Sequence, residues 1–128
     1  MLQVVQGTIA SGTTTTSTSF VDTGLTVSIT PSSSSSKIMV IACCVNILND
    51  GSNKIEFQLL RGASVLQLSV WGANVRTDGS ITFSYLDSPA TTSSTTYKVQ
   101  FKTQNAATTA YISNSNYTSS IVAMEIAA

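Results

Sequence analysis

Apolar and polar side chains alternate with a period of two along most of this chain. Leu25, Val27 and Ile29 fall on one face of the segment 25–30, and threonine or serine occupies the positions between them. The segments 81–85 and 97–103 repeat this pattern with isoleucine, phenylalanine, tyrosine and valine. Successive side chains of a β-strand point to opposite faces, so the alternation predicts strands with one buried face and one wet face.

Two segments, 37–48 and 119–127, are apolar on both faces. The two faces of the second segment are Ile121, Ala123 and Glu125 on one side, and Val122, Met124 and Ile126 on the other. A strand of this kind is typical of a central position in a sheet, with a cover on each side. We therefore expect the opposing sheet to cover one face and another surface to cover the second.

Turn signals separate these segments. Asp50-Gly51 and Asp78-Gly79 carry the Asp-Gly pair that is typical of tight hairpins. The threonine-rich stretch 13–18 fits either a strand or an exposed loop, because no apolar residue alternates with the threonines. The spacing predicts about eight or nine strands in a single domain over residues 1–128, without an amphipathic helix. The fold class that this pattern indicates is all-β, an antiparallel β-sandwich with jelly-roll topology.

The composition favours a protein that contacts other proteins. Charged residues make up 9% of the chain, against about 25% in an ordinary globular domain, and the formal net charge is zero. Serine and threonine supply the missing polarity, and such a surface does little to repel a neighbouring copy. No basic stripe is present, so we expect no nucleic-acid partner. We also expect no signal peptide and no membrane association, because no long apolar run occurs.

The chain has no histidine, which removes the commonest general base and the commonest metal ligand together. We therefore expect no catalytic residue, no metal and no cofactor. Cys43 and Cys44 are adjacent, so on a strand they point to opposite faces, and we expect two small buried residues without a disulfide. A faint candidate for a calcium site lacks the acidic density of a dedicated loop; it consists of Asn46, Asn49, Asp50 and Asn53.

Two sets of residues are candidates for contacts with other proteins. Glu125 lies in an otherwise apolar segment, where it fits either an exposed edge position or an interface ion pair. The predicted subunit interface consists of Ile121, Ala123, Glu125, Tyr85 and Tyr97. The predicted exposed contact loop surrounds the polar turn 113–116 and consists of Tyr111, Asn114, Asn116 and Tyr117.

Three segments, 17–40, 83–103 and 115–126, resemble short structural proteins encoded by tailed bacteriophages, especially those of aquatic bacteria. The resemblance covers nearly the whole chain and rests on serine- and threonine-rich phrases instead of catalytic signatures. It implies a compact jelly roll of the tumour-necrosis-factor and complement-C1q type, which typically forms a tight homotrimer. In such a trimer the neighbouring subunit supplies the second cover that the segments 37–48 and 119–127 need.

The resemblance also implies a place in the virion, with assembly in the cytoplasm of the host cell. The first hypothesis is a capsid decoration or cement protein on the outer capsid surface, with itself and the major capsid protein as partners. The second is a tail-fibre or receptor-binding tip that contacts host glycans through loops such as 104–118. The absence of coiled-coil heptads favours the first. An enzyme such as a polysaccharide depolymerase needs a carboxylate pair in a cleft, which the spacing does not offer.

Overall fold

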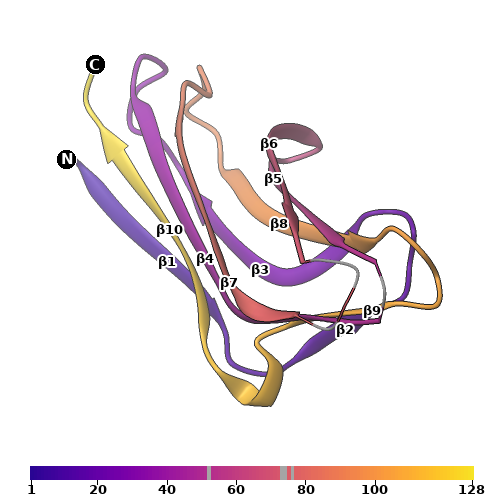
Figure 1. Cartoon of the computed structure of the whole chain (residues 1–128). Coiled ribbons are helices and arrows are strands. Elements are labelled where there is room, and N and C mark those ends of the chain that lie inside the picture. The colour runs from indigo at the N-terminus through magenta and orange to yellow at the C-terminus, as the bar shows by residue number, and fades with distance from the viewer. Residues whose placement is uncertain (52, 73–74, 76) are drawn as a thin grey trace.

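The computed structural model describes residues 1–51, 53–72, 75 and 77–128, and within them the chain forms two antiparallel sheets packed face to face (Figure 1). Sheet one contains β1 (Gln3–Ile9), β2 (Thr13–Thr15), β4 (Lys37–Asp50), β7 (Thr77–Asp87), β9 (Thr109–Ile112) and β10 (Ser119–Ile126). Sheet two contains β3 (Val21–Ile29), β5 (Ile55–Arg61), β6 (Ser64–Trp71) and β8 (Thr95–Thr103). The predicted all-β sandwich is confirmed.

The order of the strands is that of a jelly roll. β1 pairs with β10, and β2 pairs with β9. Since β1 and β2 follow each other along the chain, and β9 and β10 do so too, we count β1 with β2 as one interrupted strand and β9 with β10 as another. Counted in this way, sheet one has the order first, last, third, sixth, and sheet two has the order second, seventh, fourth, fifth. Two interlocked Greek keys give this order. The structure has ten strands in its described part instead of eight or nine, because the short β2 and β9 are separate.

The core lies between the sheets, where the predicted alternation places it. The inner side chains of β3 and β8, which include Leu25, Ile29, Val99 and Phe101, are buried, while their neighbours in sequence face solvent or the outer surface. Phe101 packs against Phe57 of β5 with ring centroids 5.9 Å apart. Burial of these faces removes apolar surface from water, which is the dominant favourable term in folding.

β4 is central, as its apolar character on both faces predicts. It pairs with β10 on one side and with β7 on the other. The ladder with β7 is interrupted between Cys44 and Ile47, where Asn46 has a positive φ of 44°. Cys44 points into the core and Cys43 points outward, so the adjacent thiols lie on opposite faces.

Neither Asp-Gly pair forms the predicted hairpin. Asp78-Gly79 lies within β7 and pairs with the end of β4, instead of forming a hairpin. The reason lies in packing: a Cβ on Gly79 would come within 2.3 Å of the Trp71 ring, so the glycine is there to admit the indole. Of the ambiguous stretch 13–18, the first three threonines form β2. Asp50-Gly51 ends β4, with Gly51 at a φ of 143°, but it forms no hairpin either, because the next strand, β5, belongs to the other sheet. Ser52 lies outside the described residues.

Candidate interaction surfaces

Four of the five residues predicted at a subunit interface lie inside this chain's own sandwich. Ile121, Ala123, Glu125 and Tyr97 have no exposed surface, because the inner faces of β10 and β8 turn them toward the opposing sheet. A side chain without exposed surface cannot contact a neighbouring subunit, so the interface role predicted for these four is wrong. Tyr85 is half-buried and packs against the core, and its interface role stays a prediction.

The outer face of sheet one is an apolar surface without a cover in this chain. The register of four strands builds one row across it from Val4, Met124, Met39 and Leu86. The two ends of the row, Val4 and Leu86, are 53% and 49% exposed, and the methionines between them are half-buried. Leu2 and Ile126 extend the row's apolar character toward the chain ends, which lie side by side (Figure 1).

The neighbouring rows become polar in steps. The next row consists of Gln6, Val122, Ile41 and Ser84, and the row after it consists of Thr8, Ser120, Cys43 and Thr82. We define the apolar face as Leu2, Val4, Met39, Ile41, Leu86, Val122, Met124 and Ile126. Among the described outward side chains of these three rows and of the strand ends beside Val4 and Leu86, Lys37 carries the one side-chain charge. Its Nζ donates to Ser88 Oγ. An apolar centre with a polar border is the anatomy of a protein–protein interface.

Glu125 is buried inside the sandwich, next to Met124 at the end of β10. Gln3 Nε2 donates to Glu125 Oε2 at 2.6 Å, and Ser32 donates to Oε1 through its backbone nitrogen at 2.7 Å and its hydroxyl at 2.8 Å. These donors, Gln3 foremost, lower the pKa of Glu125 to about 2, although burial opposes them. The carboxylate therefore ties β1 and the serine-rich loop to β10. It occupies neither the exposed edge position nor the interface ion pair expected for it.

A second buried carboxylate joins the two sheets. Asp87, at the end of β7, accepts from Arg61 Nη1 at 2.6 and 2.8 Å and from the Tyr97 hydroxyl at 2.7 Å. Arg61 belongs to β5 and Tyr97 to β8, so one side chain of sheet one holds two strands of sheet two. Burial and the hydrogen bond to Asp87 raise the pKa of Tyr97, which keeps the hydroxyl protonated as a donor. Arg61 and Tyr97 both donate to Asp87, so these three side chains serve the structure of the sandwich.

The predicted contact loop is a rigid turn between β9 and β10. Ser113, Ser115 and Asn116 have φ values of 53°, 58° and 63°, and a short 3₁₀ segment spans Asn114–Asn116. The Ser113 hydroxyl lies 2.8 Å from the Ser119 hydroxyl, and Asn46 Nδ2 donates to the Asn114 carbonyl oxygen. These contacts fix the turn to the bulge of β4.

The four residues predicted in this loop differ in exposure. Tyr117 is 62% exposed and Asn116 is also exposed, as predicted. Asn114 and Tyr111 are half-buried, because Tyr111 belongs to β9 and pairs with Leu48. The tip of the turn is thus the part that reaches solvent.

The asparagines considered for calcium hold the fold together instead. Asn49 is buried, and its amide nitrogen donates to the carbonyl oxygens of Asn53 and Val75, both at 3.0 Å, while its oxygen accepts from Thr77 N at 2.8 Å. Asn49 therefore joins the connections at both ends of the β5–β6 hairpin. Within the part of the chain that the structure describes, no three His, Cys, Asp or Glu residues gather in a way that could hold a metal ion.

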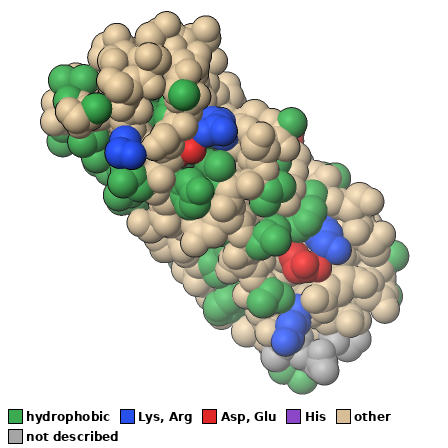
Figure 2. All heavy atoms as spheres, turned by 90° about the horizontal axis from the view of Figure 1, so that it is seen from above, with side chains coloured by type: hydrophobic (Ala, Val, Ile, Leu, Met, Phe, Trp, Pro, Cys, Tyr) green, Lys and Arg blue, Asp and Glu red, His purple; other side chains and the backbone are tan. Residues whose placement is uncertain are grey.

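The molecular surface is poor in charge. Figure 2 shows charged side chains at a few isolated places on a face that is otherwise uncharged. Four charged residues form two surface ion pairs: Lys98 Nζ lies 3.1 Å from Asp22 Oδ1, and Lys102 Nζ lies 3.1 Å from Glu56 Oε2. No helix in the described residues has the length and apolar character that crossing a membrane requires.

Comparisons with known proteins leave the family open. No protein-family model matches this chain, and no curated protein matches it in sequence. Among solved structures, it is similar to the insecticidal delta-endotoxin Cry8Ea1 from Bacillus thuringiensis, with 13% sequence identity and a TM-score of 0.47. The match covers 90% of this chain and 19% of the toxin chain, so the chain spans about a fifth of that protein. The class that the fold defines is the jelly-roll β-sandwich.

Proposed function

We propose that this chain is a non-enzymatic structural subunit that assembles with copies of itself through the apolar face. The observation that carries the proposal is the row from Val4 to Leu86, in which four strands present apolar side chains to the outside. Contiguous exposed apolar surface with a polar border marks interaction sites on soluble proteins. The half-buried methionines at its centre adapt their shape to a partner more readily than branched side chains do.

The occupant that fits this surface is a second copy of the chain. When the apolar faces of the copies meet around one symmetry axis, each copy contributes one lysine, so few like charges are buried. A net charge of zero also removes the long-range repulsion between identical molecules. We take the oligomer to be a homotrimer, the state that the resemblance to phage structural proteins implies.

We further propose that the trimer decorates the outer surface of a tailed-bacteriophage capsid and stabilises it. Jelly rolls are frequent in viral shells, and the serine- and threonine-rich segments resemble phage structural proteins. A charge-poor exterior suits attachment to a lattice of other proteins by shape and hydrogen bonds. The absence of histidine from the sequence supports a role without acid–base catalysis.

A receptor-binding tip is the second candidate, and the turn 113–118 is the observation that favours it. Ser113, Ser115 and Asn116 have positive φ values and hold this turn in one conformation. Tyr117 projects from the turn with 62% of its surface exposed. Strained backbone and an exposed aromatic side chain are frequent at binding loops.

Cryo-electron microscopy of the virion that contains this chain separates the two candidates. Decoration predicts density for the jelly roll at the local three-fold positions of the capsid, with the apolar faces turned toward one another. Density at the tail alone contradicts the capsid location and favours the tip. Particles that lack the chain should release their DNA at a lower temperature, and unchanged release contradicts the stabilising role.

A further inference from the structure

A groove of about 530 Å³ crosses the outer face of sheet two, on the side of the sandwich away from the apolar face. Its lining includes Gln58, Leu60, Val65, Thr96, Lys98 and Gln100. A smaller hollow of about 120 Å³, which shares Lys98 as a lining residue, lies beside Asp22 and the bulge of β3 at Gly24. The volume of the main groove lies within the range of small-molecule sites, about 300–1,000 Å³.

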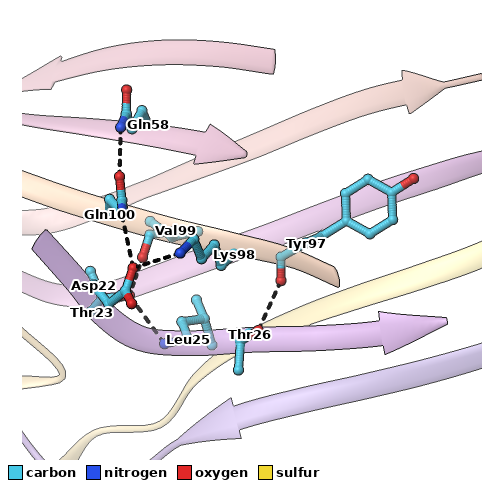
Figure 3. A network of polar contacts seen from close by, with 9 residues as sticks. All are labelled: Asp22, Thr23, Leu25, Thr26, Gln58, Tyr97, Lys98, Val99 and Gln100. Atoms are coloured by element: carbon cyan, nitrogen blue, oxygen red, sulfur yellow. Dashed lines mark hydrogen bonds and ion pairs between the residues drawn. The ribbon is translucent and has the colours of Figure 1, made fainter. Parts of the chain in front are cut away.

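A chain of polar side chains runs from β5 through β8, where its residues line the groove, to Asp22 of β3, which lines the smaller hollow (Figure 3). Gln58 Nε2 donates to Gln100 Oε1 at 2.7 Å, and Gln100 Nε2 donates to Asp22 Oδ1 at 2.9 Å. Gln58 is only 6% exposed, so its amide is held in place, and Figure 3 shows its carbonyl oxygen directed away from Gln100. The chain therefore alternates acceptors and N–H donors: the Gln58 amide oxygen and N–H, the Gln100 amide oxygen and N–H, and the Asp22 carboxylate at the far end.

The charge of the groove selects an uncharged ligand. Lys98 and Asp22 are paired at 3.1 Å, and the hydrogen bond from Gln100 and the pairing with Lys98 lower the pKa of Asp22, so the carboxylate stays ionised and the pair stays neutral overall. Leu60 and Val65 provide apolar surface beside the polar chain. A ligand that fits must present hydroxyl groups on one side and C–H groups on the other.

We propose that this groove binds a neutral oligosaccharide. Each sugar hydroxyl both donates and accepts, which matches the alternating groups of Gln58, Gln100 and Asp22. An extended peptide gains less here, because β8 already pairs with β3 on one side and β5 on the other, and no backbone donor of β8 remains for strand addition. The site is distinct from the turn 113–118, and it stands independently of the proposed assembly, which uses the other sheet.

The test is a titration of ¹⁵N-labelled protein, followed by NMR, with neutral hexasaccharides of glucose, galactose and mannose at millimolar concentration. We expect at least one probe to shift the side-chain amide signals of Gln58 and Gln100 in a saturable way. Gln100→Ala removes the centre of the polar chain and should weaken this binding about tenfold. Gln104→Ala, which truncates the same kind of side chain at an exposed position beyond β8, should bind as the parent protein does.

Several results overturn the proposal. One is the absence of shifts with every neutral probe; another is binding that Gln100→Ala leaves intact while the spectrum shows a folded protein. Binding only to a uronic-acid or sulfated oligosaccharide, abolished by added salt, would assign Lys98 to an anion instead. Shifts only with an unstructured glycine–serine peptide would make the groove a peptide site. None of these results bears on the mass of the assembly, so the two proposals fail separately.

Discussion

The Glu125 carboxylate accepts a hydrogen bond from the Gln3 side chain at 2.6 Å, and this contact joins the first strand of the sheet to the last. The backbone repeats the connection, because Leu2 N donates to the Glu125 carbonyl oxygen at 2.8 Å. β1 and β10 contribute half of the strands of the apolar face. The position of that face therefore depends on an inward carboxylate whose partners are neutral side chains and a backbone amide.

Acid should weaken this connection. The folded-state pKa of Glu125 is about 2, below the ordinary value of 4.5, so its stabilising effect is complete above pH 4.5 and is lost as the pH falls toward 2. Glu125→Gln places an amide N–H among donors, and it should lower the unfolding temperature by several degrees at neutral pH. Thermal unfolding followed by circular dichroism across this range should show a smaller acid dependence for the variant than for the parent protein.

Asp22 supplies the control for that measurement. Its pKa is also lowered, by Gln100 first and then by Lys98, but its side chain is 60% exposed. Exposed ion pairs contribute little to stability because water and salt screen them. Asp22→Asn should therefore leave the acid dependence almost as it is. An equal loss of acid dependence in both variants would contradict the role given to Glu125.

Asp87→Ala should destabilise the sandwich by about 2–3 kcal/mol, because it leaves the Tyr97 hydroxyl buried without its acceptor and frees Arg61 from its partner. Tyr97→Phe removes one hydrogen bond and keeps the ion pair, so its expected cost is about 1 kcal/mol. Urea unfolding of both variants measures the two free energies of unfolding. A smaller cost for Asp87→Ala than for Tyr97→Phe would contradict the arrangement of Asp87 as the shared acceptor.

Gly7 allows β1 to lie close to β3 of the other sheet. A Cβ at this position would come within 1.9 Å of the Thr26 backbone oxygen, which has no flexible side chain to move aside. Gly7→Ala should lower the free energy of unfolding by about 1–3 kcal/mol and speed amide exchange in β1. Gly12→Ala is the matched change, since its Cβ would meet only ordinary contacts from 3.5 Å outward. Equal stability of the two variants would contradict this packing.

The two cysteines should react differently with a thiol reagent. Burial raises the pKa of Cys44 to about 12, so this thiol should react only after unfolding. Cys43 is half-buried on the outer face, one row beyond the apolar face. Mass spectrometry of briefly labelled native protein should find one label, on Cys43. Labelling of Cys44 at an equal rate would place β4 in the opposite orientation.

The alternating strands could be predicted from the sequence, because a period of two is a local signal. Which face of 119–127 is buried could not, since Ile121 and Val122 are equally suited to a core. Contacts distant in the sequence decide it: Gln3 and Ser32 hold Glu125 inside, and the side chains next to it must then face outward. The prediction placed the interface on the wrong face of β10 for this reason.

Gly79 shows the same limit at a turn. The Asp-Gly pair that it forms with Asp78 is typical of hairpins, and the reason for a glycine within β7 is a contact with a strand that does not pair with β7. The Trp71 ring that needs this space lies on β6, in the other sheet. A local pattern could not indicate that contact.

The mass of the protein in solution tests the central claim most directly. Sedimentation equilibrium at micromolar concentration should give three times the chain mass for the parent protein. Met124→Lys places a charge at the centre of the apolar face and should give a folded monomer. Leu68→Lys makes the same kind of change, from an apolar to a charged side chain, on the other sheet, and this variant should stay assembled. A parent protein that sediments as a monomer, or a Met124→Lys variant that still assembles, would contradict assembly through this face.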